Sequence, residues 1–75
     1  MERAMTDKQK RLFDLFKLAI EREQQAQALY TDMALECEDA PLRAVIETLR
    51  HSEQLHEELL LERYKILKAD AGFTG

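Results

Sequence analysis

Apolar side chains recur at alternating steps of three and four residues in two long stretches of the chain. This spacing places them on one face of an α-helix, because each residue turns the helix by about 100°. In the first stretch, the positions on this face are Leu12, Phe16, Ala19, Glu23, Ala26, Tyr30, Met33 and Cys37. In the second stretch, they are Leu42, Ile46, Leu49, Glu53, His56, Leu60 and Leu67. Two amphipathic helices are therefore expected, each with a polar interruption in its apolar face.

Capping residues predict where both helices begin. Thr6 followed three residues later by Gln9 is the pattern of a reciprocal N-terminal cap. Asp39 stands before Ala-Pro, and its carboxylate can accept hydrogen bonds from the exposed amides of a second helix, whose first turn tolerates Pro41. Gly72 is the expected stop of that helix.

The length of the chain allows one domain. We predict an all-α fold, a single antiparallel helical hairpin over residues 1–75, with helices at about 7–36 and 40–69. A domain of this size buries little apolar surface and needs disulfides, a metal or a partner chain. Cys37 is the only cysteine, which excludes an intrachain disulfide and favours a reducing compartment. A metal, a second copy of the chain, or both are left as sources of stability.

Charge and composition exclude several classes of function. The 75 residues carry 11 basic and 15 acidic side chains, a net charge of −4, and an acidic domain repels the phosphates of nucleic acid. No uncharged apolar run approaches the roughly 18 residues that a membrane span needs. The first residues, MERAMTDKQKR, lack the apolar core of a signal peptide. We therefore expect a cytoplasmic protein that binds neither nucleic acid nor a membrane.

The three polar interruptions fall at one level of the predicted hairpin. With residue 39 as the centre of the turn, Glu23 lies 16 residues before it, or about 24 Å along its helix. Glu53 and His56 lie 14 and 17 residues after it, at about 21 and 26 Å. The lone glutamate thus lies between the two members of the Glu-x-x-His pair. Since an unpaired buried carboxylate is costly, the three side chains are expected to share a compensating partner.

A divalent metal ion is the expected partner. Carboxylate oxygens with one imidazole nitrogen suit iron or manganese, with zinc as a further substitute, whereas softer sites need thiolates. Two-metal bundles use one Glu from each of two helices and a Glu-x-x-His motif from each of the other two. One copy of the chain offers half of this set, so a twofold homodimer would complete a four-helix bundle holding two iron ions. The predicted ligands are Glu23, Glu53 and His56, with Glu53 as the bridge between the two ions.

Two motifs at these residues match a known pattern. Glu23 and Tyr30 form a Glu-x6-Tyr motif, and Glu53 and His56 form a Glu-x-x-His motif 30 residues further on. In this order they resemble the ferritin-like superfamily, particularly rubrerythrins and the short encapsulated ferritins, over about residues 12–67. In that family, paired hairpins bind iron, which dioxygen or peroxide oxidises from ferrous to ferric.

The resemblance implies a role for each of these residues. Glu23, Glu53 and His56 become the iron ligands of a ferroxidase site, and Tyr30 becomes its neighbour, without contact to the metal. It leaves open an oligomer larger than a dimer and an encapsulin shell around it. The C-terminal LKADAGFTG contains no convincing encapsulation peptide.

The chain also departs from these relatives. It lacks a rubredoxin-like cysteine quartet, which disfavours a self-contained rubrerythrin peroxidase. Arg22, Gln24 and Gln25 stand where some relatives crowd additional carboxylates as an iron entry path. Glu57, one turn after Glu53, is predicted to be a solvated acid rather than a ligand.

The preferred interpretation is an iron-oxidising protein of storage or detoxification. Three alternatives stay open. The first is a rubrerythrin-like peroxide reductase supplied by a separate electron donor, and the second is a module that binds metal without turnover. The third is a purely structural helical dimer, whose buried polar layer fixes the register of its helices.

Overall fold

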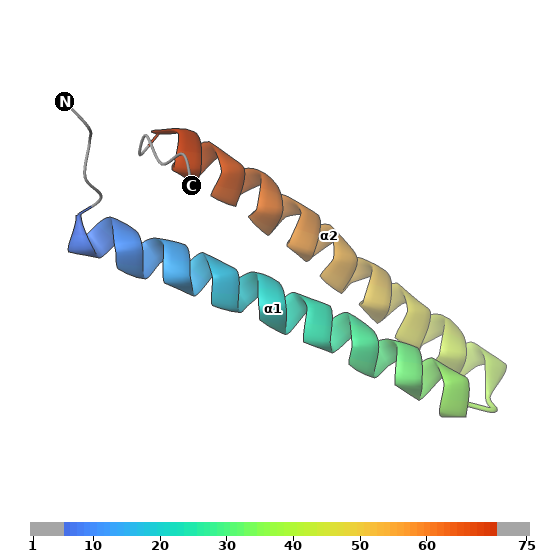
Figure 1. Ribbon diagram of the computed structural model, residues 1–75. Helices are drawn as coiled ribbons and strands as arrows, with labels where there is room; N and C mark the ends of the chain where they lie inside the picture. Colours follow the sequence, from blue (N-terminus) through green and yellow to red (C-terminus); the bar gives the residue numbers. More distant parts are fainter. Residues whose placement is uncertain (1–5, 71–75) are drawn as a thin grey trace.

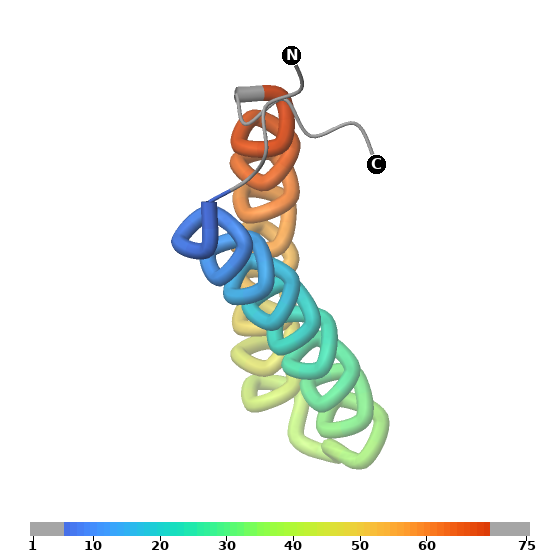
Figure 2. The backbone as a smooth tube through the Cα atoms, turned by 60° about the vertical axis from the view of Figure 1, so that its left-hand side comes forward, coloured from blue at the N-terminus to red at the C-terminus, as the bar shows by residue number. Residues whose placement is uncertain are grey.

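Two long helices and the short turn between them make up residues 6–70, the part of the chain that the computed structural model describes. Helix α1 spans Asp7–Glu36 and helix α2 spans Ala40–Asp70. They run antiparallel, so that the start of α1 and the end of α2 lie at the same end of the hairpin (Figure 1). A second view shows that the two helix axes are inclined to each other (Figure 2). The predicted all-α hairpin is confirmed.

The start of α1 is fixed by the reciprocal cap that the sequence predicts. The backbone N–H of Gln9 donates to Thr6 Oγ1 at 3.1 Å, and the backbone N–H of Thr6 donates to Gln9 Oε1 at 2.9 Å. These two bonds satisfy amides that the first helical turn leaves without an internal partner.

The turn over residues 37–39 is held by its own hydrogen bonds. The backbone N–H of Leu42 donates to Asp39 Oδ2 at 3.1 Å, which confirms Asp39 as the cap of α2. The guanidinium of Arg43 donates to the carbonyl of Cys37, and the Cys37 thiol donates to the carbonyl of Asp39 at 3.3 Å. Helix α2 extends one residue beyond its predicted end, to Asp70, and Gly72 lies outside the described residues.

The buried core between the two helices is small. Among the described residues, the buried hydrophobic side chains are Phe13, Ala34 and Ile46. Phe13 packs edge-on against Tyr64, with ring centroids 5.5 Å apart. Phe13 and Ala34 each lie one position after Leu12 and Met33, which the apolar pattern had assigned to the seam.

The predicted seam is therefore displaced in part. Leu12, Met33 and Leu49 are 42%, 43% and 42% exposed in the lone chain. The helices contact each other along a line slightly to one side of the face that carries these three residues.

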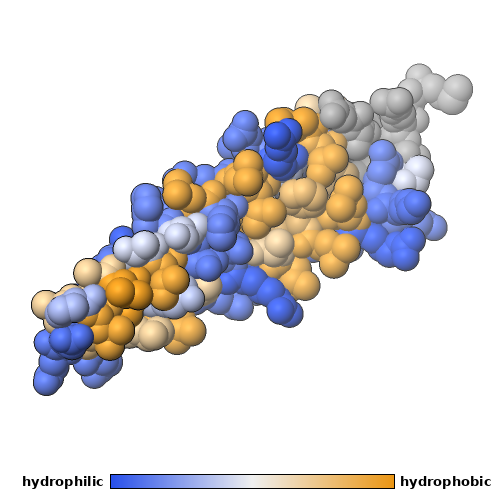
Figure 3. All heavy atoms as spheres, turned by 180° about the vertical axis from the view of Figure 1, so that it is seen from behind, coloured by the Kyte–Doolittle hydropathy of each residue, from blue (hydrophilic) through white to orange (hydrophobic). Residues whose placement is uncertain are grey.

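The hairpin is a slender rod with a large apolar surface. Its extents are 60 × 17 × 16 Å and its radius of gyration is 16.9 Å, against about 11 Å for a compact domain of this length. The accessible surface is 6034 Å², against about 4,800 Å² for a compact protein of this mass. On the face that Figure 3 shows, apolar groups gather in the half of the hairpin away from the turn and recur near the turn. Neither helix within residues 6–70 is apolar over a length that could span a membrane.

The first prediction concerns this small core. Ile46→Ala should lower the free energy of unfolding by about 2–4 kcal/mol, because Ile46 is the most buried of the three core side chains and leaves a cavity. Leu35→Ala, at a side chain that is 78% exposed near the same end of the hairpin, is the matched control and should cost less than about 0.5 kcal/mol. Urea unfolding followed by circular dichroism measures both. Equal losses in the two variants would contradict the assigned core.

Candidate metal centre

Three side chains from the two helices meet near the middle of the hairpin. Glu23 of α1 and Glu53 and His56 of α2 each place one possible ligand atom within 4.8 Å of the others. His56 Nδ1 lies 3.8 Å from Glu23 Oε2 and 3.7 Å from Glu53 Oε2. The three residues therefore converge as the helix heights predict, and their roles as metal ligands stay a prediction.

Helix geometry explains how the cluster forms. Glu53 and His56 are three residues apart, which turns them by about 60° and separates them by one helical turn. Glu23 reaches the same level because the capped turn at residues 37–39 sets the register between two uninterrupted helices. A shift of one residue in this turn would rotate one helix by about 100° and separate the donors.

The carboxylates and the imidazole differ in exposure. The side chains of Glu23 and Glu53 are 22% and 24% exposed, whereas that of His56 is 60% exposed. The two acids thus lie against the contact between the helices, and the imidazole lies at its outer edge. His56 is far more open than the apolar pattern of α2 predicts.

The cluster sets two carboxylates against one imidazole. Glu23 Oε2 is buried and, when the carboxyl group is ionised, accepts no hydrogen bond from the described part of the chain. The pKa of Glu23 is raised, first by the hydrogen bond that its protonated form shares with Glu53. Burial, the charge of Glu53 and the charge of Glu57 raise this pKa further, and His56 opposes them. A bound cation would supply positive charge to the two carboxylates, because an ionised carboxylate can only accept hydrogen bonds and cannot donate them.

The donor set fits a divalent metal with oxygen and nitrogen preferences. Two carboxylates and one imidazole suit iron or manganese. The thiol of Cys37 lies at the turn, 14 residues after Glu23, or about 21 Å along the helix axis. Three protein donors also leave coordination positions open for ligands from a second copy or from solvent.

Glu57 has a different set of partners from the three clustered residues. Gln24 Nε2 donates to Glu57 Oε2 at 2.6 Å, and Gln27 Nε2 donates to Glu57 Oε1 at 2.9 Å. The bond from Gln27 and then the bond from Gln24 lower the pKa of Glu57. Glu57 lies outside the group of possible metal donors, as predicted. The hydrogen bonds that both of its oxygens accept from the other helix were not predicted. The spacing of Gln24 and Gln27, which share one face of α1, was the available signal.

Tyr30 lies on the same face of α1 as Glu23 and is partly buried. It is seven residues further along, about 10 Å on the helix axis. Helical side chains lean toward the N-terminus of their helix, which directs Tyr30 toward the level of Glu23. Its role beside the site stays a prediction.

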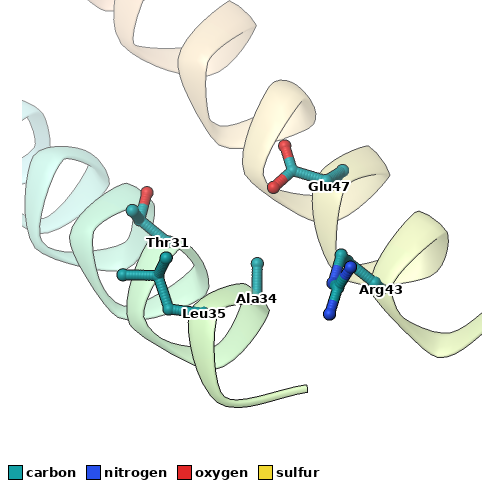
Figure 4. Close-up of a pocket in the computed structure, with 5 residues that line it drawn as sticks. All are labelled: Thr31, Ala34, Leu35, Arg43 and Glu47. Carbon is teal, nitrogen blue, oxygen red and sulfur yellow. The ribbon is translucent and has the colours of Figure 1, made fainter. Parts of the chain in front are cut away.

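A separate hollow of about 400 Å³ lies near the turn. Thr31, Ala34 and Leu35 of α1 line it from one side, and Arg43 and Glu47 of α2 from the other (Figure 4). Its charged groups have other partners, because Arg43 bonds the carbonyl of Cys37 and Glu47 pairs with Arg50 at 3.0 Å. The hollow brings no reactive groups together.

Comparison with models of protein families, with curated proteins and with solved structures gives no match. The resemblance to ferritin-like proteins therefore rests on the two motifs of the sequence.

The second prediction follows from the raised pKa of Glu23. A group whose pKa is raised by folding stabilises the folded state fully below its unfolded pKa, here 4.5, and loses that contribution as the pH rises through its folded pKa. The metal-free chain should therefore gain stability from Glu23→Gln as the pH rises from 4.5 toward neutrality. Thermal unfolding in the presence of a chelator measures this difference. Glu58→Gln, which removes an exposed acid of α2 outside the cluster, is the control.

Proposed function

We propose that the chain binds ferrous iron through Glu23, Glu53 and His56 and, paired with a second copy, oxidises it to ferric iron for storage or detoxification. The observation that carries this proposal is the meeting of three donor atoms from both helices within 4.8 Å. Two of the donors are partly buried carboxylates, which are costly to hold together without a counter-charge. A divalent cation provides that charge.

A second copy is part of the proposal, because one hairpin has half of the ligand set of a two-metal bundle. Leu12, Met33 and Leu49 share helix faces with Glu23 and His56, and each is more than two-fifths exposed in the lone chain. The imidazole of His56 opens toward the same side. Isologous pairing through this face would cover the apolar side chains and bring two sets of ligands together. This arrangement gives two ions per dimer, with Glu53 as the bridge.

Iron is the substrate in this reaction, and the residues of the chain bind and orient it. The carboxylates of Glu23 and Glu53 offset the charge of the ion, and this attraction grows when iron loses an electron. His56 adds a neutral donor and leaves positions open for the oxidant. With peroxide, two ferrous ions give one electron each, and peroxide takes up both electrons and two protons to form two waters. The reaction needs no protein nucleophile.

The third prediction tests this oxidation. Addition of ferrous salt to the wild-type chain, with dioxygen or with peroxide, should give ferric absorbance at a rate above that of buffer. Glu53→Ala should lower this rate by at least about tenfold, since even residues that only support metal ligands have effects of this size. Glu58→Ala is the matched control, because it removes an exposed acid from the same helix.

The outcomes separate the alternatives. Equal rates in the wild type and Glu53→Ala would reject the proposal. Stoichiometric metal binding with a background rate would indicate a binding module. A strong preference for peroxide over dioxygen, with turnover only in the presence of an electron donor, would indicate a peroxide reductase.

The fourth prediction concerns assembly. With zinc or anaerobic ferrous iron bound, the chain should sediment at no less than twice its mass of 8.8 kDa, with one ion per chain. Met33→Glu should weaken pairing, because it places a charge on the exposed apolar face that the proposed pairing would cover. Sedimentation equilibrium with metal analysis measures both quantities. A metal-loaded species of 8.8 kDa would contradict the paired site.

A further inference from the structure

Two hydrogen bonds join the helices directly beside the three clustered residues. Gln24 and Gln27 donate their amides to the two oxygens of Glu57, at 2.6 and 2.9 Å. One carboxylate on α2 is thus held by two donors on α1. We call Gln24, Gln27 and Glu57 the amide bridge.

The amide bridge adjoins the cluster on both helices. On α1, Gln24 follows Glu23 in the sequence, and Gln27 lies one turn beyond it. On α2, Glu57 follows His56 and lies one turn beyond Glu53. Seen along α2, Glu57 is turned about 40° from Glu53, and His56 is turned about 60° in the opposite direction. Glu53 therefore lies between Glu57, whose side chain faces α1, and His56, whose imidazole faces outward.

The buried apolar residues lie away from this level. Phe13 precedes Glu23 by 10 residues, and Ala34 follows it by 11, or about 15 and 16 Å along α1. Ile46 precedes Glu53 by seven residues, about 10 Å along α2. Apolar contacts are also non-directional, so they fix the rotation of a helix about its axis only weakly. Hydrogen bonds to a carboxylate have preferred distances and angles and are stronger than neutral ones.

We infer that the amide bridge sets the rotation of α2 against α1 and thereby positions Glu53 and His56 opposite Glu23 for metal binding. Gln24, Gln27 and Glu57 are then positioning residues that do not touch the metal. This inference rests on the proposed function, because it assigns a role at the same metal centre. It adds that the site depends on two glutamines and an acid that contribute no ligand.

The experiment uses cobalt(II) as a spectroscopic probe of the full-length chain. The double variant Gln24→Ala/Gln27→Ala removes both donors and retains the charge of Glu57 and all three ligands. Alanine favours helix, so the variant keeps its helicity. Its cobalt(II) dissociation constant should rise roughly tenfold, as for other groups that orient metal ligands, and its visible absorption spectrum should change.

Two further variants separate positioning from charge and from general stability. Gln54→Ala is the control, because Gln54 donates to Glu58 within α2 at 3.4 Å and does not join the helices. It should leave cobalt(II) binding unchanged. Gln27→Glu/Glu57→Gln exchanges the acid and the amide, keeps the net charge and restores one contact across the helices. It should recover most of the affinity and the wild-type spectrum.

The remaining outcomes overturn the inference in distinguishable ways. If the double variant binds cobalt(II) with wild-type affinity and spectrum, the amide bridge has no positioning role, even if thermal stability falls. If the double variant retains its affinity for cobalt(II) while the exchanged variant loses it, the charge of Glu57 supports metal binding and its hydrogen bonds do not. If the wild-type chain itself binds no cobalt(II), the metal centre fails together with the inference.

Discussion

Two carboxylates held against each other between the helices form the constraint on which the rest of this structure depends. Glu23 and Glu53 both lie within 4 Å of one imidazole nitrogen, and an oxygen of Glu23 is buried without a donor. Such a pair can take up a proton, move apart or bind a cation. The raised pKa of Glu23 favours the uptake of a proton, and protonation becomes less complete as the pH rises toward neutrality. Separation is opposed by the capped turn and by the amide bridge. The proposed binding of a cation would neutralise both carboxylates without separating them.

The small core explains why this constraint is tolerated. Only three hydrophobic side chains are buried among the described residues, so an isolated hairpin has little apolar burial to stabilise it. Many of its other large apolar side chains are exposed, and some of these share helix faces with the acidic cluster. A polar layer in such a surface lowers the stability gained from pairing but restricts the registers in which two copies can meet. Metal ligation and the choice of register would then depend on the same residues.

The sequence predicts the helices and the level of the site well, because both follow from regular helix geometry. Thr6 and Asp39 act as caps where their side chains indicate, and the rise per residue brings Glu23 to the level of Glu53 and His56. The rotation of each helix was predicted less well. Apolar periodicity cannot show whether Leu12 or Phe13, or Met33 or Ala34, faces the other helix, because both residues of each pair are apolar.

Apolar periodicity did not predict the amide bridge, for a related reason. An acid one turn from a predicted ligand can face solvent or contact the partner helix. Which of the two occurs depends on the rotation of the partner helix. Gln24 and Gln27 show no apolar periodicity, yet their spacing of three residues puts both on one face. Other helical hairpins can be searched for this pattern, a pair of amides at this spacing at the level of an acid on the opposite helix.

Glu23 and Glu57 illustrate how one level of a hairpin can hold two acids in opposite states. The pKa of Glu23 is raised by another acid and by burial, whereas the pKa of Glu57 is lowered by two amide donors. The two amide donors favour the ionised form of Glu57, while Glu23 retains an oxygen without a donor. Because hydrogen bonding already satisfies one acid, the cluster beside it is the place where a cation gains most. The amides thus distinguish the acid that joins the helices from the two acids of the proposed metal site.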